Sequence, residues 1–336
     1  MAITNDLLSS TLYSIRDGEV DELFKKVPFL DDAKKHGGIE YEDGGIKIQR
    51  PLSVAEHSSI SLMTTGYEPV SLAVADVLKP AIYDWCDFAA PIVISKKEEL
   101  ENSGEKAVVK IVEARMRSVM SLLRRELNKQ IIGGSSATLT TMNTLNGSTA
   151  GTNKFLEPRV PGATQTSVVG GLNKATLNVP GFFNQFQNSG AFGTGGLGAM
   201  HNIYTASNVI TPMGEINSVI ASTAAFANYK RTLFINERYI DEKTLDGGRM
   251  ALAYAGAMVS ADSDMPLNGG GAAVYSMYFI NFDGIKMVIH KDGDFAVSPF
   301  EYISGTTARA ATVYFKGQLI ADHLGSCGVL INGDVF

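Results

Sequence analysis

Cysteine and long apolar runs are the first things this 336-residue sequence has little of. Its two cysteines, Cys86 and Cys327, lie far apart and form no CxxC pair, so neither a zinc site nor a disulfide framework is indicated, and a reducing compartment is the simpler expectation. No stretch approaches the roughly 18 uncharged apolar residues that cross a membrane. Residues 1–6 show no basic and apolar leader. We therefore expect neither a secretion signal nor a membrane span.

Positive charge is also scarce. The sequence has 29 Lys and Arg against 35 Asp and Glu, a formal net charge of −6. Because phosphate binding relies on a basic field, this balance argues against a general nucleic-acid binder and leaves room only for local or weak contacts with DNA. A composition of 45% hydrophobic and 19% charged residues is that of a folded globular chain.

Catalytic and cofactor motifs are missing as well. The histidines at 36, 57, 201, 290 and 323 form no HxH, HExxH or His–Cys grouping. Neither a GxSxG nucleophile turn nor a GxxxxGK[ST] phosphate loop is present. The sequence therefore predicts no metal site, no cofactor site and no catalytic residue.

Two groups come closest to a catalytic site. Cys327 could act as a thiol nucleophile with His290 or His323, although a Cys in an apolar segment is more often a small core residue. Asp262 and Asp264 lie in a Ser/Asp turn, where capping and solvation explain them.

The stretch "GAFGTGGLGAMHN", residues 190–202, has Gly193, Gly195 and Gly198 at the spacing of a dinucleotide-binding fingerprint. That fingerprint requires a core strand before the glycines and a helix after them. Residues 180–189 carry no β-branched run, and residues 199–204 show no sustained helical period. We therefore predict a flexible Gly-rich loop rather than a nucleotide site.

The first hundred residues predict an arm and a hairpin. Residues 5–26 have apolar positions at helical spacing, with a break expected at Gly18 and an end at Pro28, so this arm must rest on the body of the protein or on a neighbour. From Ile39 the pattern becomes β-like, and residues 39–84 resemble a long hairpin excursion that leans on something outside its own domain. A β-prone run at residues 59–65 lies within it, and a compact apolar strand follows at residues 88–94.

The clearest predicted element is a helix over residues 103–132. Asn102 and Glu105 suit a capping box, and Gly133 with Gly134 marks the end. The apolar positions recur every three or four residues: Val108, Val112, Met116, Val119, Leu123, Leu127 and Ile131. Seven Lys or Arg against three Glu make this segment basic. Its basic face is either an ordinary solvated surface or one turned toward polyanion or acidic neighbours.

The remainder of the chain alternates loops with short elements. Residues 133–200 predict loops and short strands. A helix is expected over residues 211–228, and the strands that we expect are residues 232–236, 274–281, 285–290 and 312–318. This mixture predicts an α+β fold.

Taken in order, the arm, hairpin, compact strand, long helix, loop-rich region and late strands resemble the major capsid proteins of tailed bacteriophages. The likeness is carried by Ile39–Arg50 and onward, by Trp85–Ser95 leading into the helix, and by the tail "YFINFDGIKMVIHKDGDF" then "SPFEYISGTTARAATVYFKGQLIADHLGSCGVLING". The resemblance implies the α+β phage capsid fold named after coliphage HK ninety-seven. Its expected parts are an N-terminal arm (1–38), an extended E-loop hairpin (39–84), a P domain with the spine helix 103–132 (85–140), an axial A domain (141–290), and late strands that complete the P domain and return to the A domain (291–336).

The resemblance also implies a function. Many copies would assemble as hexamers and pentamers into an icosahedral shell around double-stranded DNA, as the capsid of a virion built in the bacterial cytoplasm. The implied partners are other copies, a portal protein, decoration proteins and packaged DNA through weak contacts, with no membrane partner. Because the spine helix begins near residue 103, a scaffolding protein would be separate or absent. The Lys–Asn pair that crosslinks subunits in some relatives is not identifiable.

Two alternatives stay open. An encapsulin-like shell has the same fold but encloses protein cargo. An enzyme of unrecognised type would use Cys327 or the acids near Asp262.

Overall fold

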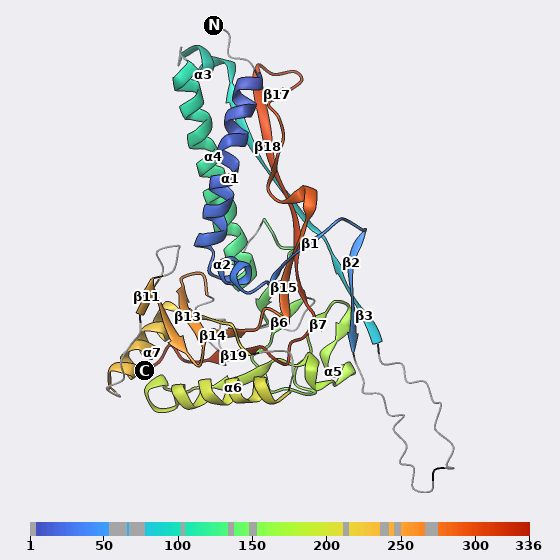
Figure 1. Ribbon diagram of the computed structural model, residues 1–336, viewed down its shortest axis with the longest axis vertical. Helices are drawn as coiled ribbons and strands as arrows, with labels where there is room; N and C mark the ends of the chain where they lie inside the picture. Colours follow the sequence, from blue (N-terminus) through green and yellow to red (C-terminus); the bar gives the residue numbers. More distant parts are fainter. Residues whose placement is uncertain are drawn as a thin grey trace.

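A long limb rises from a broad base in the computed structural model (Figure 1). The structure describes residues 5–53, 66, 78–101, 105–133, 138–147, 153–210, 215–235, 242–244, 250–265 and 275–336. The predicted β-prone run at 59–65 and the capping residue Asn102 lie outside these ranges.

The limb is built on the predicted long helix. Helix α4 (Glu105–Asn128) continues through a π-helical turn, η1 (Lys129–Gly133), and is preceded by the short α3 (Lys96–Glu101). Its buried positions include Val108, Val112 and Met116, so the prediction of a helix that ends at Gly133 is confirmed over the described residues.

Helix α1 (Asn5–Lys26) lies beside α4, and α2 (Pro28–Lys35) follows after a single residue (Figure 1). The expected break at Gly18 is wrong, because α1 runs through it. A helical glycine costs about 1 kcal/mol relative to alanine, and packing of the apolar face outweighs that cost. Leu8, Leu12, Leu23 and Phe24 are buried as expected, so the arm rests on the chain's own spine helix.

A six-stranded sheet connects the limb to the base. Its centre is the long strand β18 (Ala308–Ala321), which pairs with β4 (Cys86–Ser95) along one edge. The other edge of β18 pairs with β15 (Ile285–His290), β16 (Ala296–Val297) and β17 (Glu301–Tyr302), and β1 (Ile39–Glu42) adds parallel to β15. The strands predicted at residues 88–94, 285–290 and 312–318 are confirmed.

A seven-stranded sheet forms the base, in the order β11-β12-β13-β10-β14-β19-β9. Its strands are β9 (Gln185–Asn188), β10 (Ser218–Ser222), β11 (Glu242–Thr244), β12 (Met250–Tyr254), β13 (Ala257–Asp262), β14 (Tyr275–Ile280) and β19 (Gly328–Ile331). Helices α6 (Leu197–Ile210) and α7 (Thr223–Ile235) pack on one face through a core that includes Val219, Phe279 and Leu330. Alternate residues such as Ile220, Tyr278 and Val329 enter the larger core on the other face, so both faces of this sheet are covered.

The predicted helix over residues 211–228 is wrong over residues 215–222 and confirmed only over residues 223–228, and the strand predicted at 232–236 is wrong over its described residues, 232–235. Residues 218–222 form β10, and α7 begins only at Thr223 and runs through Thr232. All five residues of β10 are buried, between β13 and β14. A strand buried on both faces shows a continuous apolar run rather than alternation, and this run imitates a helical period.

The predictions that no strand precedes the glycines at 193–198 and that no helix follows them are also wrong. A strand, β9, precedes them, and helix α6 follows a π-helical turn η3 (Phe192–Gly196). Strand β9 is an edge strand that pairs only with β19 among the described strands, so it tolerates Gln and Asn. Helix α6 buries Met200, Ile203 and Ser207, a helical spacing that was present in the sequence.

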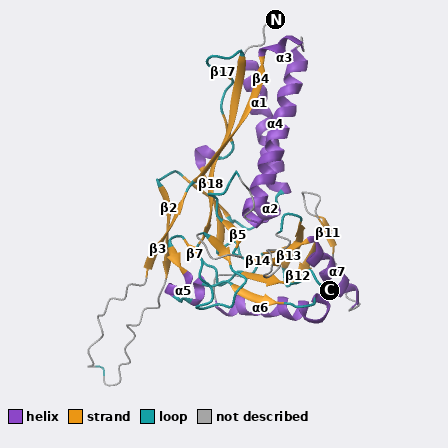
Figure 2. Ribbon diagram, turned by 180° about the vertical axis from the view of Figure 1, so that it is seen from behind, coloured by secondary structure: helices purple, strands orange, loops and turns teal. Residues whose placement is uncertain are grey.

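The hairpin strands β2 (Lys47–Ser53) and β3 (Leu78–Asp84) pair antiparallel and lie at one side of the base, next to β7 (Val168–Val169) (Figure 2). Beside them lie two small sheets, β5 (Thr144–Asn146) with β6 (Lys154–Leu156), and β7 with β8 (Leu172–Asn173). Three short helical turns complete the described elements: α5 (Lys174–Leu177), η2 (Pro180–Phe182) and η4 (Lys291–Gly293).

Candidate assembly surfaces

Strands β4 and β18 pair antiparallel over ten residues of each strand, from Cys86↔Gly317 to Ser95↔Ala308. Side chains alternate between two faces of this ribbon. One face carries Phe88, Ile92, Ile94, Val313 and Phe315, which are buried in the core that α1 and α4 also enter. On the opposite side, between the pair Asp87↔Lys316 at one end and the pair Ser95↔Ala308 at the other, lie six residues that we call the outer ribbon face: Ala89, Pro91, Val93, Ala310, Thr312 and Tyr314.

The outer ribbon face carries no charge. Val93 is 39% exposed and Tyr314 is 37% exposed, and the small residues between them add only apolar or hydroxyl groups. An ion pair, Asp87 with Lys316 at 3.6 Å, marks one end of the face. An antiparallel sheet that faces water normally alternates apolar and polar residues, and an exposed apolar sheet face marks an interaction surface. The signal was readable in "CDFAAPIVIS", in which no charged residue follows Asp87 at the outward positions.

The base of the β2–β3 hairpin is fixed to the body of its own chain. The Tyr83 hydroxyl donates to the carbonyl of Ala321 at 2.8 Å, and the amide of Ile82 donates to the carbonyl of Gly170 at 2.9 Å. Gly170 and Gly171 form the two-residue turn between β7 and β8 with φ of +57° and +80°, which glycine adopts without strain. A Cβ on Gly170 would lie 2.6 Å from the Cβ of Ala81, so only glycine lets the hairpin approach this closely.

A network of charges lies beside that anchor. Arg50 on β2 contacts the carboxylates of Glu40 and Glu42, and Lys286 on β15 contacts Glu40 at 2.7 Å. Partial burial raises the pKa of Glu40, but the hydrogen bond from Lys286 and the charge of Arg50 outweigh it and leave that pKa below its usual value. Burial raises the pKa of Asp322, which lies 3.6 Å from Lys286. The network fixes the hairpin strand to β1 and β15.

Some of the basic side chains of the spine helix form ion pairs with acids of their own chain. Arg115 pairs with Glu98 of α3 at 2.5 Å, and Arg117 pairs with Glu19 of α1 at 3.2 Å. The two interpretations of this basic face were a solvated surface and a surface turned toward polyanion or acidic neighbours. These ion pairs support contact with acidic groups, and the acids belong to the same chain.

The thiol considered as a nucleophile is inaccessible. Cys327 is fully buried, and its sulfur is hydrogen-bonded with the backbone of Asn281. Burial raises the pKa of Cys327 to about 11, so the reactive thiolate is disfavoured at neutral pH. His290 lies elsewhere, with its ring edge-on to Trp85 and its Nδ1 accepting from the amide of Asp292. Burial lowers the pKa of His323.

Two of the glycines at 193–198, Gly193 and Gly195, are packed closely against other parts of their own chain. A Cβ on Gly193 would lie 3.0 Å from the ring of Phe336, and one on Gly195 would lie 2.7 Å from the carbonyl of Ser189. The amide of Phe192 donates to the carbonyl of Val335 at 2.7 Å. Gly193 thus allows close packing against the C-terminal Phe336 and Gly195 against the backbone before it, whereas a Cβ on Gly198 would have nothing within 4 Å.

Asp262 and Asp264 form the expected turn, in which the amide of Asp264 donates to Asp262 Oδ1 at 2.7 Å. Within the described ranges, no group of three His, Cys, Asp or Glu side chains is placed to hold a metal ion. Nor does any described helix have the length and hydropathy needed to cross a membrane.

A buried polar cluster in the base is not predicted from the sequence. Lys174 and Glu157 are both fully buried, with Nζ and Oε1 3.7 Å apart. Lys174 Nζ donates to the carbonyl of Phe155 at 2.6 Å and to Asn184 Oδ1 at 3.2 Å. The amide of Ser167 donates to Glu157 at 2.7 Å. This cluster ties four loop segments together.

No protein-family model and no curated protein matches the sequence. Solved structures do match it. The capsid of cyanophage A-1(L) is 16% identical, with 91% of this chain and 92% of that chain covered and a TM-score of 0.61. The capsid of Myoviridae phage XM1 is 12% identical, with 89% and 91% covered and a TM-score of 0.52. The SrpI encapsulin of Synechococcus elongatus PCC 7942 is 10% identical, with 88% and 84% covered and a TM-score of 0.51. The resemblance drawn from the sequence is thus confirmed at the level of the fold: this chain has the α+β fold of phage capsid and encapsulin subunits.

Proposed function

We propose that this protein is a structural, non-enzymatic subunit that assembles with copies of itself into a closed protein shell. The observation that carries the proposal is the outer ribbon face, an uncharged strand surface left exposed on the limb of a chain with the fold of shell subunits. Covering that face with another copy removes apolar area from water, which favours assembly by roughly 25 cal/mol per Å² buried.

The finer proposal is a phage capsid. Copies assemble as hexamers and pentamers into an icosahedral shell around double-stranded DNA, in the cytoplasm of a bacterial host. The greater overlap with the cyanophage capsid than with the encapsulin supports this choice. The net charge of −6 suits a wall that holds packaged DNA only weakly. A portal and decoration proteins would complete the particle, and any scaffolding protein would be separate.

In this proposal the parts keep the expected bounds: N-terminal arm 1–38, E-loop 39–84, P domain 85–140, A domain 141–290 and late strands 291–336. The antiparallel pairing of β2 with β3, and the hydrogen bonds that hold β3 to the body of the chain, support the E-loop assignment, because an E-loop is a hairpin anchored at its base.

An encapsulin-like shell is the second candidate, supported by the match to the SrpI encapsulin over 88% of this chain. Particles isolated from the natural source separate the two candidates. Nuclease-resistant double-stranded DNA inside supports the capsid, and a protein cargo without DNA supports the encapsulin-like shell.

The test of assembly is to express the chain alone or with candidate scaffolding proteins, separate it on a calibrated sedimentation gradient and image the fast fraction by negative-stain electron microscopy. The variant Val93→Lys places a charge on the outer ribbon face, and burial of an unpaired charge costs several kcal/mol at each interface. We expect shells or capsomer rings from the wild type and slow-sedimenting subunits from the variant.

The matched control is Val160→Lys, because Val160 is 60% exposed on a loop of the base. This control should assemble normally, and both variants should keep the wild-type circular dichroism spectrum. A wild-type protein that stays a small oligomer with every candidate scaffold refutes the proposal, and equal assembly of Val93→Lys removes the outer ribbon face from it.

A further inference from the structure

Three strands of this chain lie at the edges of their sheets. Among the described strands, β4 pairs only with β18, and β2 and β3 pair only with each other. An edge strand presents a row of backbone N–H and C=O groups to which a strand of another copy can add. Proteins protect such edges with charged side chains, bulges or prolines.

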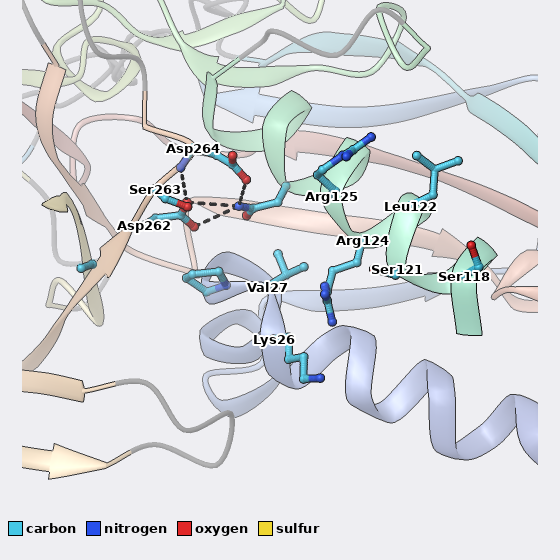
Figure 3. A pocket seen from close by; sticks show the side chains of 13 residues that line it. Lys26, Val27, Ser118, Ser121, Leu122, Arg124, Arg125, Asp262, Ser263 and Asp264 are labelled. Carbon is cyan, nitrogen blue, oxygen red and sulfur yellow. Dashed lines mark hydrogen bonds between the residues drawn. The ribbon is translucent and has the colours of Figure 1, made fainter. Parts of the chain in front are cut away.

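Charge is distributed unevenly over the limb. On its helical side, Lys26, Arg124 and Arg125 line a cavity of about 790 Å³ between α1, α4 and the end of β13 (Figure 3). On the ribbon side, no residue of the outer ribbon face is charged. Charged side chains on that face therefore do not protect the edge of β4.

Pro91 occupies an outward position on β4. Its partner across the ribbon, Thr312, turns its backbone the other way: the Thr312 amide donates to Ser298 Oγ at 2.9 Å, and the Thr312 carbonyl accepts from the Ser298 amide at 2.9 Å. Directly opposed residues of an antiparallel pair either bond to each other or both point outward, so the backbone of Pro91 points away from β18. Because proline has no N–H, this point of the edge offers no donor to an added strand.

The next two outward positions of β4 are already bonded. Every second residue of a strand points to the same edge, so Val93 and Ser95 follow Pro91 there. The Val93 carbonyl accepts a hydrogen bond from the Arg115 guanidinium, and the amide of Ser95 donates to Glu98 Oε2 at 3.1 Å. Arg115 and Glu98 also pair with each other at 2.5 Å. A strand added at this edge would have to displace that ion pair.

The hairpin strands carry prolines in the same kind of position. Pro51 of β2 lies directly opposite Pro80 of β3. The amide of Ile82 donates to the carbonyl of Gly170, outside the hairpin, at 2.9 Å, so Pro80, two residues earlier, also faces outward and Pro51 faces the other outer edge. Each edge of the hairpin therefore lacks a donor near its middle. All of these prolines are exposed, so packing in the core does not account for them.

We propose that Pro51, Pro80 and Pro91, together with the Arg115–Glu98 pair, prevent strands of other copies from adding to these edges. Contacts between copies are thereby restricted to the faces of the strands, such as the outer ribbon face, a step that rests on the proposed function. An apolar face beside an open edge would otherwise favour disordered β-aggregates over an ordered shell. These residues determine how copies join rather than how tightly they bind.

The test is the aggregation of the full-length chain with Pro91→Val, which restores an N–H on the edge of β4. Chains are incubated at one concentration and temperature, and aggregation is followed by thioflavin T fluorescence and by the infrared band of intermolecular β-sheet. We expect Pro91→Val to aggregate roughly threefold faster than the wild type, with that band present. Pro80→Val should behave in the same way at the edge of the hairpin.

The matched control is Pro161→Val, at an exposed proline in a loop of the base. Both substitutions give the unfolded chain the same additional freedom, so the control removes that contribution. It should aggregate at the wild-type rate.

A second pair of variants leaves the sequence of β4 unchanged and keeps the proposal testable if Pro91→Val folds poorly. Arg115→Met removes the donor that occupies the Val93 carbonyl, and Arg117→Met removes an arginine of the same helix that pairs with Glu19 instead. We expect faster aggregation of Arg115→Met than of Arg117→Met.

Equal aggregation within either pair, Pro91→Val with Pro161→Val or Arg115→Met with Arg117→Met, would overturn the proposal for β4. Equal aggregation of Pro80→Val and Pro161→Val would overturn it for the hairpin. A wild type that forms no shell, while Pro91→Val and Arg115→Met still aggregate faster than their controls, would refute the proposed function and support the protection of the edges.

Discussion

The seven-stranded sheet of the base and the β4–β18 ribbon of the limb differ in how many of their faces are covered by the rest of the chain. The base sheet is covered on one face by α6 and α7 and on the other by the larger core, and all of β10, β14 and β19 is buried. The ribbon is covered on one face only, and its outer face leaves Val93 and Tyr314 in contact with solvent. The base sheet is therefore covered on both faces within one chain, whereas one face of the ribbon stays exposed in the single chain.

This difference separates two kinds of stability. Substitutions inside the base should change the free energy of unfolding of a single chain, and substitutions on the outer ribbon face should change assembly and leave the fold intact.

The largest effect is expected at the buried ion pair of the base. Lys174→Met removes the buried ammonium and leaves the fully buried carboxylate of Glu157 with Arg159, 3.8 Å away, as its remaining cationic partner, which should cost about 3 kcal/mol of unfolding free energy. Urea denaturation of the unassembled chain, followed by circular dichroism, measures this loss.

Two controls accompany the substitution. Lys79→Met, at an exposed lysine of β3, should change the unfolding free energy by less than about 0.5 kcal/mol. The double variant Lys174→Met with Glu157→Met should recover part of the loss, because it removes both charges. If Lys174→Met lowers the unfolding free energy no more than Lys79→Met does, the buried ion pair does not stabilise the base, and the contrast between base and ribbon fails.

The second prediction concerns pH and the same lysine. Burial lowers the pKa of Lys174 to about 8 from an ordinary value of 10.5, although the charge of Glu157 opposes the shift. The unfolded chain therefore binds more protons than the folded chain between pH 8 and 10.5, so this group makes the protein more stable as the pH rises through that window. The full difference corresponds to about 3 kcal/mol.

Other groups act in the opposite direction. Burial raises the pKa of Cys327 to about 11, and that of Tyr41 to about 12, so these groups remove stability once their unfolded counterparts ionise. The measurement is therefore the difference in unfolding free energy between the wild type and Lys174→Met at pH 8 and 9.5. That difference should grow with pH, and a constant difference would contradict the assignment.

The sequence predicted the elements that carry a simple period and missed those shaped by tertiary packing. The spine helix was readable because Val108, Val112 and Met116 repeat at helical spacing. Strand β10 was read as part of a helix because burial on both faces replaces alternation with an apolar run. The Lys174–Glu157 pair joins residues in a loop-rich segment, where no period indicates which side chains meet. The outer ribbon face was visible as missing charge, but only the pairing of β4 with β18 shows that its residues share one surface.

The smallest effect is expected in the arm of the limb, where the chain can be stabilised without touching either sheet. Gly18 lies inside α1 with a helical backbone, and nothing lies within 4 Å of the position that a Cβ would take. Gly18→Ala should therefore raise the unfolding free energy by about 0.5–1 kcal/mol, because alanine loses less backbone freedom on folding and creates no clash. Chemical denaturation of unassembled chains measures the gain, and sedimentation should show the wild-type yield of particles. A gain in stability that also abolished assembly would show that α1 has to leave the spine helix before copies join. In that case the arm, like the outer ribbon face, would be completed by a neighbouring chain rather than by its own fold.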